Sequence, residues 1–233
     1  MKAGGIAVLV GAALLAAATL GAQPKTAKQS APIDLTGYWV AFVTEDWRFR
    51  MVTPHKGDYQ AVPMTQEARK VADAWDPAAD EAAGNQCKAY GAAAIMRLAA
   101  RFHITWQDDN TLRVESDAGM QTRTFHFNSA AAPSGERSWQ GYSMAQWERQ
   151  GSLKVSTINL RAGYLRKNGV PYSENAAVTE YFDLAPLEQG GQVMLVTTVV
   201  DDPQYLQLPF IVSSQFKKEA DGSKWDPTPC SAK

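Results

Sequence analysis

The chain has 233 residues, of which 45% are hydrophobic and 20% charged, and its formal net charge at pH 7 is −1. That length is enough for one domain with a sizeable core. The nearly balanced charge and the lack of a basic run argue against a nucleic-acid partner, because polyanion binding normally needs a positive patch.

Residues 1–22 have the pattern of a secretory signal peptide. A short positive start, Met1-Lys2, precedes an apolar run rich in Ala, Leu and Val, and small residues follow at Gly21-Ala22. The run is short for a stable membrane span, and an uncleaved anchor is the alternative. We therefore expect a periplasmic or secreted protein with no membrane span after signal removal.

The polar stretch 23–32 lacks periodicity and predicts a flexible leader, followed by a single β-barrel domain over 33–233. Residues 38–52 are aromatic and β-branched and predict a first strand with a bulge near Glu45-Asp46. Thr65 is placed to cap a helix that ends at Asp76-Pro77. Residues 78–100 suit either a second short helix or a loop across the sheet.

From Arg101 onward, apolar and polar residues alternate with the period of β-strands. Strands are predicted over 101–106, 112–115, 122–127, 139–148, 153–160, 178–182, 193–200 and 210–217. Consecutive strands with short turns favour a mainly β fold, an up-and-down antiparallel barrel of about eight or nine strands with one or two short helices after the first strand. A β-sandwich is the alternative.

The chain has two cysteines, Cys87 and Cys230. In an exported protein, two cysteines favour one disulfide, and two separate free thiols are the alternative. These two residues and the dispersed histidines offer too few neighbouring ligands for a metal site. We therefore predict a disulfide, no metal and no cofactor.

Residues 139–155 resemble a strand pair found in a group of exported bacterial proteins, with the pattern W-x-G-H-S-I-G-x-W-E-G-D-T-L-V-V. The match runs from Trp139 to Glu148 and continues at Ser152-Leu153-Lys154-Val155. This chain has Tyr142 where the group typically has His, and Arg149-Gln150 where it has Gly-Asp. The resemblance implies a calycin-like or lipocalin-like barrel in the periplasm and brings no activity with it.

One face of the predicted central strands carries aromatic residues separated by small ones, a pattern that shapes an apolar cavity or packs a core. Arg123 and Glu180 share the parity of apolar neighbours. They either enter the barrel, where they pair with each other or bind the polar group of a ligand, or lie at its rims in water. The predicted ligand-binding residues are Arg123, Phe125, Phe127, Trp139, Trp147 and Glu180.

His126 is a candidate general base, with Glu148 or Tyr142 as its partner. Its parity, opposite to that of the neighbouring phenylalanines, argues for an outward side chain. The common hydrolase and nucleotide-binding motifs are absent from the sequence.

Three functions follow as hypotheses. The favoured one is an exported lipocalin-like protein that binds a small apolar or aromatic molecule in its barrel. The alternatives are a cofactor-free periplasmic lyase, isomerase or hydrolase that uses the same cavity, and a non-catalytic structural protein of the envelope.

Overall fold

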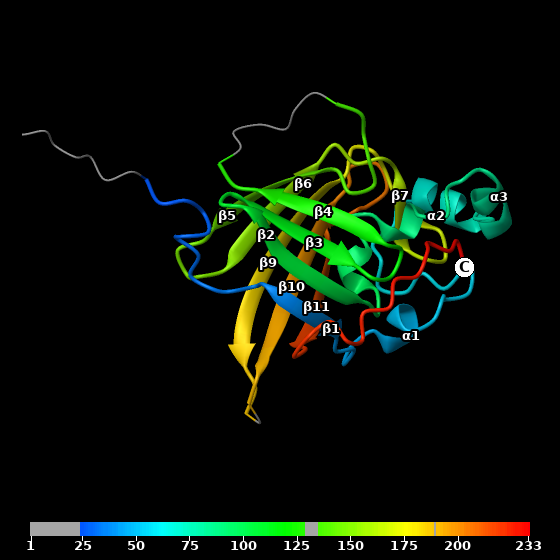
Figure 1. The fold of residues 1–233 in the computed structure, drawn as a ribbon. Coiled ribbons are helices and arrows are strands. Elements are labelled where there is room, and N and C mark those ends of the chain that lie inside the picture. Colours follow the sequence, from blue (N-terminus) through cyan, green and yellow to red (C-terminus); the bar gives the residue numbers. More distant parts are fainter. Residues whose placement is uncertain (1–23, 129–134, 189) are drawn as a thin grey trace, which may run out of the picture.

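The computed structural model describes residues 24–128, 135–188 and 190–233, so the predicted signal peptide lies outside the described residues. Nine strands close a barrel in the order β1-β11-β10-β9-β6-β5-β4-β3-β2 (Figure 1). Their bounds are Gly37–Ala41 (β1), Arg101–Asp108 (β2), Thr111–Ser116 (β3), Gln121–His126 (β4), Tyr142–Trp147 (β5), Leu153–Ile158 (β6), Ala177–Pro186 (β9), Gln192–Asp201 (β10) and Phe210–Lys218 (β11). The predicted mainly β barrel of eight or nine strands is confirmed.

The topology departs from a simple meander in two places. Strands β4 and β5 pair in parallel, with Phe125 opposite Ser143. A parallel pair needs a connection that crosses from one end of the barrel to the other, so a tight hairpin turn cannot join β4 to β5. In addition, β7 (Gly163–Arg166) and β8 (Val170–Tyr172) form a separate hairpin between β6 and β9.

Side chains fill the barrel along its interior face. On β9, Val178, Glu180 and Phe182 alternate with more exposed residues, as a strand with one face inward requires. Phe102 and Phe216 meet edge to face with their ring centroids 5.2 Å apart. The following interior residues are 0% exposed and leave no room beside them for a water molecule: Trp39, Phe102, Leu153, Val155, Glu180, Phe182, Met194, Val196 and Phe216.

Three short helices, α1 (Trp47–Arg50), α2 (Gln66–Asp73) and α3 (Pro77–Ala82), precede β2. The predicted helix after Thr65 is confirmed as α2, and the Thr65 hydroxyl accepts a hydrogen bond from the Ala68 amide. Asp76-Pro77, predicted to end the helix, also begins α3, because the Asp76 carboxylate caps it. Residues 78–100 contain the end of α3 and two 3-10 helices, η1 (Lys88–Tyr90) and η2 (Ile95–Arg97).

The first strand is much shorter than predicted. It ends at Ala41, and the chain then turns through Asp46, whose φ of 51° is left-handed, into α1. Beyond Phe42 the chain carries charged residues on both parities, which a strand with one buried face cannot accommodate. The turn lets Arg50 point inward while Trp47 stays exposed.

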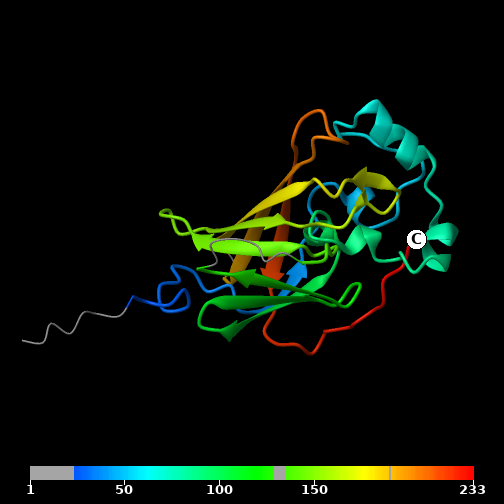
Figure 2. The same ribbon diagram turned by 90° about the horizontal axis from the view of Figure 1, so that it is seen from above.

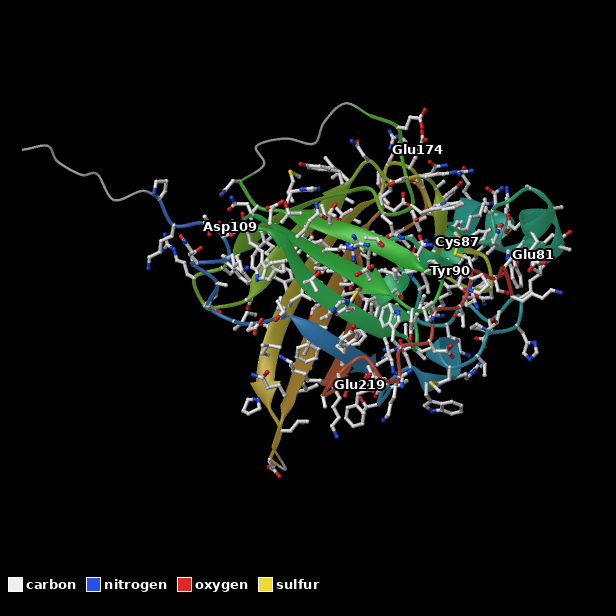
Figure 3. The ribbon with its side chains drawn as sticks, viewed as in Figure 1. Glu81, Cys87, Tyr90, Asp109, Glu174 and Glu219 are labelled. Carbon is white, nitrogen blue, oxygen red and sulfur yellow. A yellow bond between two sulfur atoms is a disulfide. The ribbon has the colours of Figure 1, made fainter. Side chains whose placement is uncertain are left out.

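The two ends of the barrel are covered differently (Figure 1). Residues 24–32, within the stretch 23–32 predicted as a flexible leader, contain a turn that lies against one end. The Lys28 amide donates to the carbonyl of Asp109, labelled in Figure 3, and the Trp147 indole donates to the carbonyl of Ala27. The helices and the β7–β8 hairpin lie at the other end, where a second apolar cluster includes Leu165, Tyr172 and Phe210.

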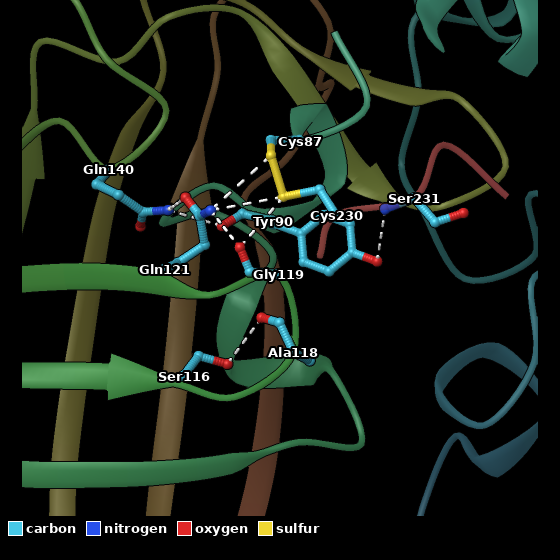
Figure 4. The surroundings of a disulfide bond; sticks show 9 residues. All are labelled: Cys87, Tyr90, Ser116, Ala118, Gly119, Gln121, Gln140, Cys230 and Ser231. Carbon is cyan, nitrogen blue, oxygen red and sulfur yellow. Dashed lines mark hydrogen bonds between the residues drawn. A yellow bond between two sulfur atoms is a disulfide. The ribbon is translucent and has the colours of Figure 1, made fainter. Parts of the chain in front are cut away.

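The predicted disulfide between Cys87 and Cys230 is present, and it joins positions separated by 143 residues. It fixes the C-terminal tail, which runs along the barrel from β11 to the helical end (Figure 2). Beside the bridge, the Gln121 amide donates to the Gly119 carbonyl, and the Ser231 amide donates to the Tyr90 hydroxyl (Figure 4).

Candidate functional site

Two of the predicted ligand-binding residues meet inside the barrel. Arg123 on β4 and Glu180 on β9 form a bidentate ion pair across the lumen, with Nη1–Oε1 and Nη2–Oε2 distances of 3.0 and 2.5 Å. Arg123 also donates to the hydroxyl of Thr157, which shares a hydrogen bond with the hydroxyl of Ser143. The exposed fractions of the Arg123 and Glu180 side chains are 1% and 0%. The two charges therefore neutralise each other in the interior and do not belong to an open surface.

The predicted aromatic residues are divided between the interior and the outside. Phe125 and Phe127 face inward, and the Phe127 ring lies 5.2 Å from that of Trp147 at the end covered by residues 24–32. Trp139 lies before β5, partly exposed, with the Arg161 guanidinium 4.5 Å from its ring. It is outside the barrel because the chain bends at Gly141, whose φ is 59°.

The three catalytic candidates lie outside the barrel core. The His126 ring stacks on that of Tyr142 at 4.8 Å, and its Nε2 is 3.0 Å from the Thr124 hydroxyl. Glu148 follows β5 and accepts a hydrogen bond from the Gln146 side chain at 2.7 Å. The His126 side chain points outward, as its parity predicts, and its ring meets that of Tyr142. A catalytic role for His126 stays a prediction.

A different group of side chains surrounds a small cavity at the helical end of the barrel. Three arginines line it, Arg50 at the end of α1, Arg97 at the end of η2 and Arg166 at the end of β7. Their exposed fractions are only 8%, 5% and 3%. The cavity has a volume of about 20 Å³, and the rest of its lining is Phe49, Val52, Ala89, Ala94, Leu98, Leu165 and Lys167. We call this cavity and its lining the arginine pocket.

Each guanidinium of the arginine pocket has some of its N–H groups paired. Arg50 binds the Glu45 carboxylate and the Arg97 carbonyl, at 2.5 and 2.9 Å. Arg97 binds the Asp46 carboxylate at 3.2 Å. Arg166 donates from Nη1 to the carbonyl of Gln60 at 2.7 Å, and its Cζ lies 4.0 Å from the centre of the Phe49 ring.

Four nitrogens of these guanidiniums have no acceptor among the residues that the structure describes: Arg50 Nη2, Arg97 Nη1, Arg166 Nε and Arg166 Nη2. A buried donor without a partner costs about 1–3 kcal/mol, and more when it is charged. Nε and Nη2 of one arginine form the planar edge that binds a carboxylate or phosphate through two parallel hydrogen bonds. The arginine pocket therefore has the donors of an oxyanion site.

Burial lowers the pKa of all three pocket arginines, and for Arg97 the neighbouring guanidiniums of Arg166 and Arg50 act in the same direction. Burial and the neighbouring Arg166 guanidinium lower the pKa of Arg97 to about 10, against the opposing effect of Asp46. Burial also lowers the pKa values of Arg50 and Arg166, again with nearby carboxylates acting in the opposite direction. An additional anion would reduce this repulsion, because it would favour the charged form of all three groups.

Sequence reasoning missed the arginine pocket. Arg50 falls within the segment predicted as a strand, and Arg97 and Arg166 lie on elements that only the fold brings near it. One signal was present: Arg97 is the only charged residue in the apolar run 92–100. A charge inside such a run is buried when the run is, and it then needs a partner.

Comparisons with protein-family models, with curated proteins and with solved structures each found no match. The resemblance to exported bacterial proteins therefore stays a prediction. In the described part of the chain, no helix has both the length and the apolar character that crossing a membrane requires.

Proposed function

We propose that this chain is an exported binding protein that holds a small oxyanion-bearing molecule in the arginine pocket. The proposal keeps the small-molecule ligand expected from the sequence and moves its site from the barrel interior to the barrel end. The reason for the move is packing, since side chains occupy the lumen around Glu180 and Phe182. Export is supported by the signal-like N-terminus and the disulfide.

The observation that carries the proposal is the unpaired Nε/Nη2 edge of Arg166 beside the free nitrogens of Arg50 and Arg97. Water is able to satisfy neutral donors, but three guanidiniums that repel one another gain more from a negative charge. The pocket has room for one water-sized group, and one oxygen of a carboxylate or phosphate is about that size.

Isothermal titration with acetate, inorganic phosphate and sulfate tests the proposal. We expect at least one of these anions to bind saturably at a single site. An Arg166→Gln variant should bind at least about tenfold more weakly, because a hydrogen bond to a charged group is worth about 1.5–3 kcal/mol. The matched control is Arg161→Gln, which changes an arginine that lies on Trp139 instead.

Two results would refute the proposal. One is the absence of saturable binding by all three anions, which would leave an envelope structural protein as the better hypothesis. The other is equal binding by the Arg166→Gln and Arg161→Gln variants. Circular dichroism of each variant must first show the wild-type β signal, and Arg97→Gln gives a second variant of the pocket.

A further inference from the structure

We infer that the ligand of the arginine pocket is an apolar or aromatic monocarboxylic acid, whose carboxylate enters the pocket while its apolar body lies on the exposed rim. This inference rests on the proposed function and names the chemical class of the ligand. It uses three observations: the planar donor edge, the apolar walls and the exposed apolar residues next to the pocket.

The donor edge suits a planar anion. Arg166 has both Nε and Nη2 unpaired, and its guanidinium is held against the face of Phe49. Two parallel N–H groups match the two oxygens of one carboxylate. Arg50 and Arg97, which line the same cavity, each have one further unpaired nitrogen.

The walls disfavour a phosphate. Apart from the arginines and Lys167, the lining consists of Phe49, Val52, Ala89, Ala94, Leu98 and Leu165. A tetrahedral anion has oxygens on every side, and those that face apolar walls would lose their hydration without gaining a hydrogen bond. A carboxylic acid has its polar atoms at one end only, so its apolar body is able to meet such walls.

The rim supplies a surface for that apolar body. The cavity of about 20 Å³ is too small for more than the head of an organic acid. Beside it, Val52 is 60% exposed, and the α1 segment also exposes Trp47 (66%) and Met51 (58%). Large apolar side chains exposed together often mark a binding surface. Figure 1 shows α1 and β7 at the same end of the barrel, where a ligand would lie between them and solvent.

Local charges agree with a negative charge on the ligand. Arg50 and Arg97 each have a carboxylate partner, Glu45 and Asp46. Arg166 and Lys167 also line the pocket and have no ion-pair partner within the described ranges, although Arg166 lies near enough to Asp46 and Asp58 to feel their charge. The lining therefore keeps an excess of positive charge, which the carboxylate of a bound acid would reduce.

The experiment compares octanoate with three probes that each lack one feature: 1-octanol without the charge, acetate without the chain, and inorganic phosphate without the planar head. Tryptophan fluorescence and isothermal titration follow binding to the full exported chain. We expect octanoate to bind at least about tenfold more tightly than each of the others, since a buried methylene contributes ~0.8 kcal/mol.

A rim variant tests where the chain of the acid lies. Met51→Ser should lower the ratio of octanoate to acetate affinity by about threefold or more, because it removes apolar contact from one ligand only. Leu208→Ser is the matched control, since Leu208 is 69% exposed and lies in a separate groove with Ile211. An equal change in the two variants would overturn the position of the chain on the rim.

The outcomes separate this inference from the proposed function. If phosphate or acetate binds as tightly as octanoate and Arg166→Gln abolishes that binding, the anion site stands and the monocarboxylic acid is wrong. If 1-octanol binds as tightly as octanoate, the arginines do not select the ligand and both proposals fall. If none of the four probes binds, both fall as well.

Discussion

At the scale of single residues, the ion pair of Arg123 and Glu180 makes the strongest prediction about stability. Both side chains are buried, so removing one charge leaves the other without a partner in a low-dielectric interior. Glu180→Gln should lower the free energy of unfolding by about 3–5 kcal/mol, as measured by urea denaturation.

The double variant Arg123→Met/Glu180→Leu is the control, because it removes both charges and keeps the volume apolar. We expect it to be more stable than Glu180→Gln and close to the wild type, since well-packed apolar residues often replace a buried pair without loss. A Glu180→Gln protein within about 1 kcal/mol of the wild type would show that the pair is solvated in solution.

Residue parity predicted which side chains share a strand face. Arg123, Phe125 and Glu180 turn inward with their apolar neighbours, whereas parity alone left the rims of the barrel as the alternative for the two charges. Parity allowed the two charges to pair but could not select that arrangement, since β4 and β9 are far apart in the sequence. Nor could it predict the position of Trp139, because the bend at Gly141 places that residue before the strand begins.

At the scale of elements, Gly141 explains where β5 starts and makes a second prediction. Its φ is 59°, and a Cβ there would collide with the carbonyl oxygen of Ile158. Gly84 has a similar positive φ, of 69°, but nothing lies near its Cβ position. Gly84→Ala should therefore cost about 1–2 kcal/mol for backbone strain, and Gly141→Ala should cost more.

Thermal denaturation of the two glycine variants measures the difference. The backbone penalty is common to both, so the comparison isolates the collision at the start of β5. Equal melting temperatures would mean that the β5 entry relaxes freely, which would remove our explanation for the position of Trp139.

The N-terminal turn makes a third prediction. A chain that starts at Ile33 lacks Ala27 and therefore the acceptor of the Trp147 indole. Compared with a chain that starts at Gln23, it should be about 1–3 kcal/mol less stable, from one lost hydrogen bond and the lost apolar contact. Its tryptophan fluorescence should also be quenched more strongly by acrylamide. Identical quenching would mean that residues 24–32 do not cover this end in solution.

The segment around α1 shows why the bounds of an element are harder to predict than the buried face of a strand. Residues 38–52 include many aromatic and β-branched residues, which favour one long strand, although both faces are apolar only in the first half. The chain instead turns at Asp46, because Arg50 then reaches Glu45 and the Arg97 carbonyl in a buried position. These contacts join residues from different elements, so local propensity alone cannot predict them.

At the scale of the whole molecule, the barrel was predictable because each strand carries its own period-two signal and the turns are short. The parallel pair β4–β5 was not, since the period-two signal of a strand specifies neither its pairing partner nor its direction. The arginine pocket was not predictable either. Its three arginines meet only because the hairpin β7–β8, η2 and α1 close one end of the barrel.

The disulfide makes the last prediction, because it acts on the chain as a whole. It links Cys87 to Cys230 across 143 residues, and a loop of this length constrains the unfolded chain by about 5 kcal/mol in the loop-entropy model. The Cys87→Ser/Cys230→Ser variant should lose stability up to that amount in urea denaturation. Reductant should destabilise the wild type similarly and leave the variant unchanged.

Loss of the bridge should release the tail before it unfolds the barrel. The tail contacts the barrel through the bridge between Ala118 and Thr228, the ion pair of Glu219 with Arg101, the packing of Trp225 against Tyr38 and His103, and a hydrogen bond from the Ser231 amide to Tyr90. These contacts are fewer than those of the barrel strands, which pair with neighbours on both sides. Hydrogen exchange should therefore rise first in residues 219–233. Exchange that rises equally in β10 would instead mean that the tail and the barrel unfold as one cooperative unit, with the disulfide holding the barrel itself closed.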